Sequence, residues 1–437
     1  MKIHILASAL LMVCLSDNVL AHAKPAQNLA RSEKFVQVQG IQFIIGSQSH
    51  HFLGTNLWYG INLGSRGPGG DQARLLRELD RLQALGVTNL RVVAASEGPN
   101  SAPFRMQPSL QTSPGVFDEQ LLHGLDFLLV EMQKRDMHAI MCLGNFWQWS
   151  GGFAQYVSWA DGTSIPYPEQ FGWTTFENYS ASFYVNDKAK SMYNRTVDLI
   201  VSRVNTLSGI SYSSDPTIMA WELANEPRGQ NQPDAYLNWV SDTAARIKQL
   251  DTNHLVTTGS EGLTASQDNT QTRPELVHAL QNIDYLTFHI WIQNFGWYDP
   301  HIPATYEKST KQALEYVEQH VSMAERLGKP AVFEEFGIAR DGGDFNVTAT
   351  TSVRDQYYQT MFEASLRAAI KGRPLNGVNF WAWAGEGRPV NAGDLWQIGT
   401  PFIGDPPHEP QGWYSVYDQD SSTTDIIKRY AQLMNSL

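Results

Sequence analysis

The sequence has few features that would connect it with metals, disulfide bonds, nucleic acids or membranes. It contains two cysteines and no HExxH, CxxC or EF-hand pattern, so we expect no metal site and no cofactor. The net charge of −12 argues against a nucleic acid or an anionic membrane as partner, because both need a basic face. Apart from the N-terminal region, no run is apolar over the roughly 20 residues that span a bilayer.

The N-terminus has the layout of a secretory signal peptide. An apolar run, Ile5 to Leu15, follows a lysine and precedes the small-residue pattern Ala21-His22-Ala23. We therefore expect residues 1–23 to be removed after Ala23, and the mature protein to be extracellular or periplasmic.

The two cysteines fit this interpretation. Cys14 could carry a lipid anchor, but Val13 before it is a poor match to the small residue expected there. Loss of the signal peptide leaves only Cys142, which lies in an apolar run and is expected to be buried and inert. An intramolecular disulfide is then impossible.

What remains is the composition of a folded protein, with 42% hydrophobic and 17% charged residues. One unit repeats along it: a short apolar strand, a loop and an amphipathic helix. The clearest helix carries leucines at helical spacing between Asp71 and Leu85, and Gly86 ends it. Further helices are predicted from near Asp118 and over Asp187–Asn205, Asp234–Leu250, Gln312–Leu327 and Ser352–Ile370.

Eight apolar segments between these helices are predicted strands. They are Leu53–Tyr59, Thr88–Ala95, His138–Phe146, Thr217–Ala224, Leu255–Ser260, Asp284–Ile290, Pro330–Phe336 and Gly377–Ala384. Strand–helix alternation indicates a parallel sheet, and eight units indicate an α/β fold closed as a (β/α)₈ TIM barrel.

The rest of the chain fits around such a barrel. Phe35–Ile45 is predicted to form a small hairpin at the barrel bottom, and residues 24–437 to form a single domain. Two long segments, Trp147–Asn186 and Gly385–Trp413, follow strands three and eight. Active sites of these barrels lie at the C-terminal strand ends, so both segments are expected to wall a functional cleft.

Acidic residues interrupt the apolar strands at three strand ends. Asn225-Glu226-Pro227 ends strand four, Glu261 follows strand five, and Glu334-Glu335 ends strand seven. A buried charge is costly unless it is paired or used, so these carboxylates indicate either a salt-bridge network or an active site. Two carboxylates across a barrel mouth are what glycoside hydrolysis needs, one protonated and one ionised. Alternation shows that only one of Glu334 and Glu335 faces the mouth, without deciding which.

The motifs resemble glycoside hydrolase family 5, and within it the β-mannanases and exo-acting β-mannosidases, including bacterial members. The resemblance covers roughly Phe35 to the C-terminus. Its motifs lie in order on successive strands: Asn89-Leu90-Arg91, Asn145-Phe146-Trp147, Trp221 to Pro227, Phe288 to Trp291, Phe333 to Gly337, and Asn379-Phe380-Trp381.

The resemblance assigns roles to matching positions. It implies that Glu226 is the general acid/base, that Glu335 is the nucleophile, and that Arg91 holds the nucleophile ionised. It makes Asn225 the partner of the sugar 2-hydroxyl and Glu334 a supporting residue. The family reaction retains the anomeric configuration.

The remaining substrate-binding residues are mostly aromatic. The resemblance places His289, Trp291 and Trp381 around the reacting sugar. Many family members have tyrosine where this chain has Trp291, which leaves the donors that orient the nucleophile open. Further candidates from position alone are Trp58, Trp147, Asn145 and, for a distal subsite, Trp297, while Glu261 could bind sugar or support His289.

The residues are compatible with a mannan hydrolase, with a hydrolase of another glycan, and with a carbohydrate-binding barrel. We expect a secreted hydrolase of β-1,4-mannosidic bonds in mannan, with endo action favoured and exo action, or a β-glucan or xylan substrate, as alternatives. A carbohydrate-binding barrel without activity would require loss of a carboxylate or of Arg91, and both are present. A monomer is expected.

Overall fold

A computed structural model describes residues 34–437 of the protein. The predicted signal peptide, Cys14 and the cleavage site after Ala23 lie outside the described residues. In the described part of the chain, no helix is both long and apolar enough to cross a membrane.

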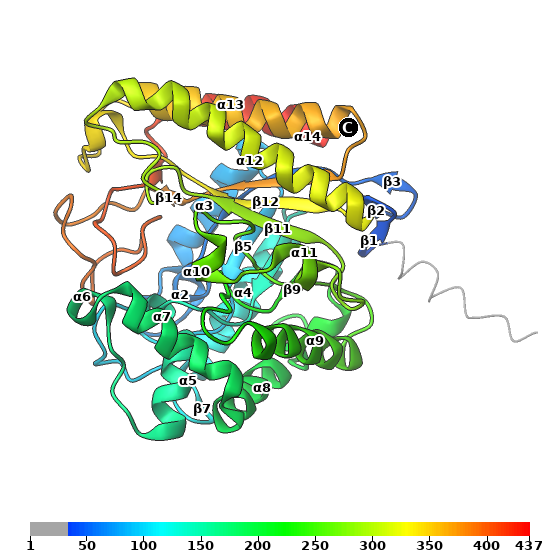
Figure 1. Cartoon of the computed structure of the whole chain (residues 1–437), viewed down its shortest axis with the longest axis vertical. Coiled ribbons are helices and arrows are strands. Elements are labelled where there is room, and N and C mark those ends of the chain that lie inside the picture. The colour runs from blue at the N-terminus through cyan, green and yellow to red at the C-terminus, as the bar shows by residue number, and fades with distance from the viewer. Residues whose placement is uncertain (1–33) are drawn as a thin grey trace, which may run out of the picture.

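Eight parallel strands form the centre of the fold (Figure 1). They are β4 (Phe52–Asn56), β5 (Asn89–Val93), β8 (His138–Cys142), β9 (Ile218–Glu222), β10 (Leu255–Thr257), β11 (Leu286–Ile290), β12 (Ala331–Phe336) and β13 (Leu375–Phe380). Each overlaps one predicted strand, and neighbours pair in the order β10-β9-β8-β5-β4-β13-β12-β11. Hydrogen bonds from Asp284 N to Val256 O and from His289 N to Glu261 O join β10 to β11. The predicted (β/α)₈ barrel is confirmed.

The predicted strand over Gly377–Ala384 is wrong in its last part. The barrel strand β13 ends at Phe380, and Trp383–Gly385 forms a separate strand, β14, which pairs with β15 (Val416–Tyr417). An apolar run continues across both elements, so the sequence alone does not show the break.

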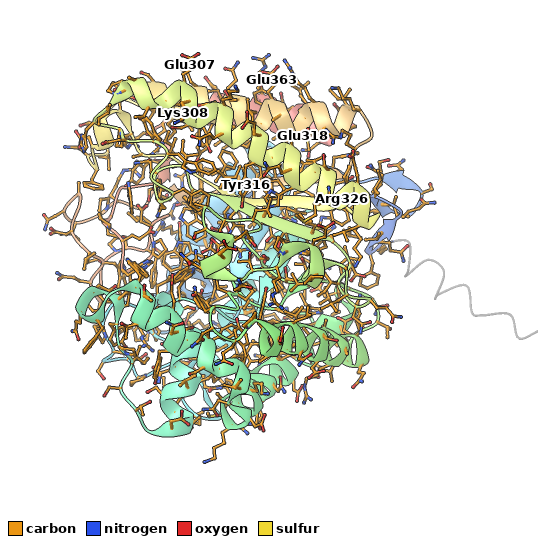
Figure 2. The ribbon with its side chains drawn as sticks, viewed as in Figure 1. Glu307, Lys308, Tyr316, Glu318, Arg326 and Glu363 are labelled. Carbon is orange, nitrogen blue, oxygen red and sulfur yellow. The ribbon has the colours of Figure 1, made fainter. Side chains whose placement is uncertain are left out.

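Helices cover the barrel and follow the predicted positions closely. The main ones are α3 (Gln72–Leu85), α4 (Glu119–Gln133), α8 (Asp187–Val201), α9 (Pro233–Leu250), α12 (Tyr306–Leu327) and α13 (Ser352–Ile370). The Asp71 carboxylate accepts from Arg74 N at 2.9 Å at the start of α3, and Gly86 ends it at φ 81°, where glycine is favoured. Glu307 and Lys308 extend outward from α12 (Figure 2).

One long helix was not predicted. Residues Ser421–Asn435 form α14, which packs against α13 and α3 and buries Ile427, Tyr430, Ala431 and Met434. These four positions have helical spacing, so the signal was present in the sequence.

The N-terminal hairpin closes the bottom of the barrel, as predicted. Strands β1 (Val36–Gln39) and β2 (Gln42–Ile45) pair antiparallel, and β3 (Gln48–Ser49) adds a third strand. Phe43 is fully buried, with its ring centroid 6.5 Å from that of Phe52 and 5.3 Å from that of Tyr285. In Figure 1 this small sheet lies at the opposite end from the orange segment that follows β13.

The two long segments differ in structure. The one after β8 contains η1 (Gln148–Ser150), α5 (Gly152–Asp161), α6 (Pro168–Phe171), α7 (Trp173–Ala181) and η2 (Ser182–Val185). Residues 386–415, all of them described, contain no helix or strand. Buried Asp405 organises this second segment by accepting from Gly412 N, Tyr414 N and the Ser415 hydroxyl at 2.6–2.8 Å.

Shorter elements complete the chain. They are α2 (Gly60–Gly64), β6 (Gln111–Ser113), β7 (Val116–Phe117), η3 (Tyr212–Ser214), α10 (Gln267–Thr270), α11 (Pro274–His278), η4 (Pro303–Thr305) and η5 (Asp341–Gly343).

Candidate active site

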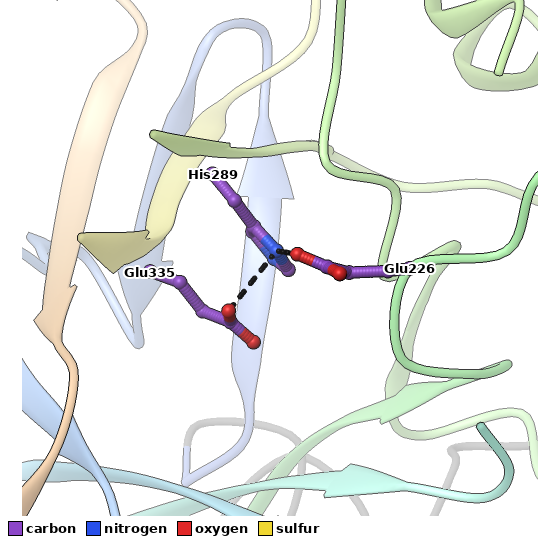
Figure 3. Close-up of side chains that lie close together, drawn as sticks. All are labelled: Glu226, His289 and Glu335. Carbon is purple, nitrogen blue, oxygen red and sulfur yellow. Dashed lines mark hydrogen bonds and ion pairs between the residues drawn. The ribbon is translucent and has the colours of Figure 1, made fainter. Parts of the chain in front are cut away.

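Two carboxyl groups and a histidine meet at the C-terminal ends of the strands (Figure 3). His289 Nδ1, on β11, lies 2.7 Å from Glu226 Oε1 and 3.3 Å from Glu335 Oε2. Glu226 follows β9, and Glu335 is on β12. One ligand atom from each of the three residues lies within 4.8 Å of the other two, so the barrel brings together carboxyls that are 109 positions apart in the chain.

The backbone holds Glu226 in an uncommon conformation. Its φ is 50°, in the left-handed region that residues other than glycine rarely adopt. Hydrogen bonds from Asn225 N to Gly144 O and from Glu226 N to Gly259 O, both 2.9 Å, fix the segment between the neighbouring strands. Strain held in this way is common where a side chain must be aimed at a site.

The Arg91 guanidinium lies at the centre of the polar network. It donates to Glu335 Oε1, to Asn225 Oδ1 at 2.8 Å and to Asn56 Oδ1 at 3.1 Å. It also donates to both carboxylate oxygens of Glu222, at 2.6 and 2.8 Å. Glu222 is not among the predicted site residues, although an acid inside an apolar strand is a usable signal in the sequence.

Neighbouring Glu334 and Glu335 point to different surroundings. Glu335 is part of the cavity wall and contacts Arg91. Neither carboxyl oxygen of Glu334 has a hydrogen-bond partner among the described residues, and the nearest cation, Arg91 Nε, is 3.8 Å away. Burial, followed by repulsion from Glu222, raises the pKa of Glu334 well above its ordinary value.

The donors that orient Glu335, left open by the sequence, are visible here. The Trp291 indole N–H donates to Glu335 Oε2 at 3.3 Å, while Arg91 donates to the other oxygen. The indole of Trp291 therefore supplies the second donor to Glu335.

Glu226 has a different set of partners. The Trp147 indole N–H donates to its Oε2 at 2.6 Å, and His289 is hydrogen-bonded to its Oε1. Burial lowers the pKa of His289 well below 6.5, and nearby Arg91 lowers it further, so the imidazole is neutral. Glu226 is thus held by neutral groups and Glu335 by a cation.

Both carboxyls are harder to ionise than in water. Burial raises the pKa of Glu226, against the field of Arg228 and the Trp147 hydrogen bond. Burial also raises the pKa of Glu335; Arg91 opposes this, and repulsion from Glu226 adds to it. Two carboxylates this close share a proton at a pH where isolated ones would both be ionised.

These groups line a cavity of about 450 Å³, within the usual range for a ligand site. Of the predicted residues, it exposes Glu226, Glu335, Asn225, Trp147, Trp291 and Trp381. His289 and Arg91 lie directly behind the carboxyls. Residues that sequence analysis did not propose for this wall include Trp173, Glu177, Arg228, His408, Glu409 and Trp413. Most of these lie in the two long segments, whose length and aromatic content were the available signal.

Glu261 pairs with an arginine that was also missed. Arg228 donates to Glu261 Oε1 and Oε2 at 2.5 and 3.0 Å, and to Glu177 Oε1 at 2.8 Å. Its guanidinium lies 4.7 Å from the Trp147 ring centroid. Glu261 therefore supports Arg228 and Trp147 through its side chain, and it reaches His289 only through its backbone carbonyl.

A buried acid outside the cavity holds the segment that carries Trp147. The Glu97 carboxylate accepts from Gly152 N at 2.9 Å and from the Tyr156 hydroxyl at 2.8 Å, and Glu97 N donates to Ser150 O. Burial raises the pKa of Glu97 to about 7. No sequence pattern marked this residue, because its partners come from a different loop.

Two of the positional expectations disagree with the packing. Trp58 is buried away from the cavity, packed on Trp149 and Phe402, and donates to Gly404 O at 2.9 Å. Asn145 is fully buried, and its amide is used within the protein: Oδ1 accepts from Asn225 Nδ2 at 3.2 Å, and Nδ2 donates to Ser150 Oγ at 3.0 Å. Trp297 packs on Phe295 and Tyr316 and is partly exposed, so its distal subsite stays a prediction, while Phe295 itself reaches the cavity.

Comparison with known proteins shows relatives along nearly the whole chain. Residues 33–437 match the family described as "GH family 5 beta-mannosidase-like". A curated tomato protein, mannan endo-1,4-beta-mannosidase 4 of Solanum lycopersicum, is 28% identical over 84% of this chain and 87% of its own length. Mannan endo-1,4-beta-mannosidase 3 of rice, Oryza sativa subsp. japonica, is 30% identical over 79% of this chain and 72% of its own length.

Solved structures are also similar to this chain over most of its length. The glycoside hydrolase family 5 mannosidase from Rhizomucor miehei is 37% identical, with a TM-score of 0.86 over 93% of this chain and all of that one. The endo-beta-1,4-mannanase from Thermotoga petrophila shares the fold, with a TM-score of 0.66 and 24% identity over 89% of this chain and 78% of its own.

Removal of the Arg91 guanidinium should destabilise the protein strongly. In Arg91→Met, the carboxyls of Glu222 and Glu335 remain buried without their cation, which costs about 3–5 kcal/mol in the free energy of unfolding. Without Arg91 the pKa of Glu335, which burial already raises, moves further above the unfolded value of about 4.3, so the deficit grows as the pH rises from 5 to 8. Urea denaturation at both pH values measures this.

A matched control is Arg77→Met. Arg77 pairs with Glu386 but is half exposed, so its loss should lower the free energy of unfolding far less than the loss of Arg91. Equal decreases in the free energy of unfolding for Arg91→Met and Arg77→Met would contradict a central role of Arg91.

Proposed function

The chain belongs to the β-mannosidase-like group of glycoside hydrolase family 5, and from this we propose that it cleaves β-1,4-mannosidic bonds with retention of configuration. Glu335 is the proposed nucleophile and Glu226 the proposed general acid and base. Asn225 keeps one amide hydrogen for the sugar 2-hydroxyl, because Arg91 and Asn145 engage the rest of its amide.

One observation carries the retaining mechanism. An oxygen of Glu226 and one of Glu335 lie no more than 4.8 Å apart. Retaining enzymes keep their carboxyl groups about 5–5.5 Å apart, whereas inverting enzymes need about 6.5–9.5 Å to admit a water between them. The short separation supports direct attack by one carboxylate on the sugar.

The partners of each carboxyl support the division of roles. Arg91 stabilises the ionised form of Glu335, which a nucleophile requires. Glu226 has no arginine within ion-pair distance among the described residues, so we place the shared proton on Glu226 rather than on Glu335. In the first step Glu335 attacks the anomeric carbon while Glu226 protonates the leaving oxygen. In the second step Glu226 accepts a proton from water, which displaces Glu335.

The relatives support mannan as the substrate class. The curated plant relatives carry the name mannan endo-1,4-beta-mannosidase, and a variant of the Rhizomucor miehei mannosidase was solved in complex with mannosyl-fructose. The aromatic wall formed by Trp147, Trp291 and Trp381 suits the apolar face of a pyranose ring.

The shape of the cavity favours attack at chain ends. Trp173 of α7 and His408 of the segment after β13 meet with ring centroids 6.5 Å apart, and both line the cavity. The two long segments thus contact each other beside the carboxyls and restrict the cleft. Endo action, favoured from the sequence, is the second candidate because the curated relatives carry that name.

We also propose export through the predicted signal peptide and a monomeric state. The support for export is the sequence of residues 1–23.

Replacing Glu226 or Glu335 should lower activity to different extents, because the two carboxyls have different proposed roles. Glu226→Gln should lower kcat/KM on mannobiose by about 10²–10⁴-fold, the usual contribution of a general acid. Glu335→Gln should lose turnover altogether, and an activated 2-deoxy-2-fluoro-β-mannoside should label Glu335 of the unmodified protein, as read by peptide mass spectrometry. Glu334→Gln replaces a carboxyl that has no hydrogen-bond partner among the described residues by an isosteric amide, and should keep most of its activity. Label on any other residue would overturn the assignment.

The indole hydrogen bond to Glu226 should be visible in the pH profile. It favours the ionised form of Glu226, so Trp147→Phe should raise the pKa of this acid and move the alkaline limb of kcat/KM to higher pH. Trp149→Phe serves as the control, because Trp149 lines the cavity without a hydrogen bond to Glu226 among the described contacts. A shift to lower pH would refute the proposed contact.

Products from mannohexaose distinguish the two modes of action. If the contact between Trp173 and His408 restricts the cleft to chain ends, the enzyme should release mannose alone at early times, measured by anion-exchange chromatography. A mixture of shorter oligosaccharides from the first time point would establish endo action instead.

A further inference from the structure

A second cavity lies on the same face of the barrel as the carboxyls. It has a volume of about 680 Å³ and is formed by residues that follow β4, β5 and β13. Its outer wall is the segment 386–402, part of the orange trace at the left of Figure 1. We call it the outer groove.

The outer groove contains a rigid aromatic surface. The partly exposed Trp396 ring stacks on Phe402, with centroids 4.9 Å apart and planes at 11°. Phe402 in turn stacks on buried Tyr59. An aromatic ring held flat in this way presents the kind of apolar surface that the C–H face of a sugar ring covers.

The groove also offers unused hydrogen-bonding groups. Gln107 is part of its wall and is more than nine-tenths buried, yet its Oε1 has no partner among the described residues. Leaving a buried acceptor unpaired costs free energy, which a ligand hydroxyl would recover. Asn100 beside it uses its Oδ1 to accept from Ser109 N and keeps its amide donor.

The charges in the groove favour a neutral ligand. Two arginines, Arg74 and Arg388, and two acids, Asp71 and Glu386, line it. Arg74 pairs with Glu78, Arg388 with Asp418, and Glu386 with Arg77. Asp71 has no ion pair among the described residues, but its carboxylate caps α3 by accepting from Arg74 N at 2.9 Å. An anion would find no uncompensated cation, whereas a ligand made of hydroxyls and apolar faces matches the groove.

We propose that the outer groove binds a second stretch of β-mannan chain without cleaving it. This rests on the proposed function for the identity of the sugar. Trp58 separates the groove from the catalytic cavity, since its ring contacts Phe402 on one side and Trp149 on the other, both with centroids 5.6 Å apart. A chain held in the groove would keep polymer near the carboxyls while the cavity acts on an end.

The test compares a polymer with a short substrate. Trp396→Ala should raise the dissociation constant for soluble glucomannan about three- to tenfold, the range expected for one lost aromatic contact. The binding is read as retardation in native affinity gels of the full chain carrying Glu335→Gln, so that nothing is hydrolysed. In the active enzyme, Trp396→Ala should lower the rate on glucomannan and leave kcat/KM on mannobiose unchanged.

Two further variants supply a second substitution in the groove and a control outside it. Gln107→Leu removes the unpaired acceptor and should weaken retardation in the same direction even if Trp396→Ala folds poorly. Val390→Ala changes an exposed residue on the same segment that lies outside the groove, and should have no effect.

The outcomes separate the two proposals. Unchanged retardation in both groove variants would overturn the proposal that the outer groove binds mannan. Equal losses of hydrolysis rate on mannobiose and glucomannan would overturn it as well. Retardation by glucomannan that depends on Trp396, with no hydrolysis of mannobiose or mannan by the unmodified enzyme, would overturn the proposed function and leave the groove standing.

Discussion

The buried guanidinium of Arg91 is the interaction on which the active site depends. It hydrogen-bonds to side chains from three other barrel strands or their ends, Asn56, Glu222 with Asn225, and Glu335. A planar fork of five donors can satisfy this many acceptors at fixed angles, which an ammonium group cannot. Because Arg91 pairs with both Glu222 and Glu335, a single cation lowers the cost of burying two acidic side chains beneath the cavity.

The two proposed catalytic carboxyls differ mainly in what surrounds them. Glu335 contacts a cation that belongs to the barrel itself, so its position follows from the strands. Glu226 is held by a left-handed backbone turn and by the indole of Trp147, which comes from the long segment after β8. Arg228 and Glu97 hold that segment from either side. The acid therefore depends on loop structure in a way that the nucleophile does not.

The long segments after β8 and β13 also form the walls of the cavities to which we assign the polysaccharide. The segments after β8 and β13 meet at Trp173 and His408 and narrow the cleft beside the carboxyls. The segment after β13 also builds the outer groove around Trp396, on the far side of Trp58. One irregular stretch, organised by the buried carboxylate of Asp405, thus contributes to both surfaces.

Much of this protein could be predicted from local sequence. Strand and helix periodicity determined the barrel, and motifs at successive strand ends indicated the family. The position of Glu226 followed from its neighbours, whereas Glu335 was selected over Glu334 only by the family resemblance. The hydrophobic pattern repeats with each element, so it needs no knowledge of distant contacts. Only the tertiary structure decided the surroundings of individual side chains: Glu222 beneath Arg91, Glu334 buried without a hydrogen-bond partner among the described residues, Trp58 in the core, and Arg228 over Trp147. A tryptophan or a glutamate carries the same local signal in a core and in a cleft, and only the packing of its neighbours distinguishes the two.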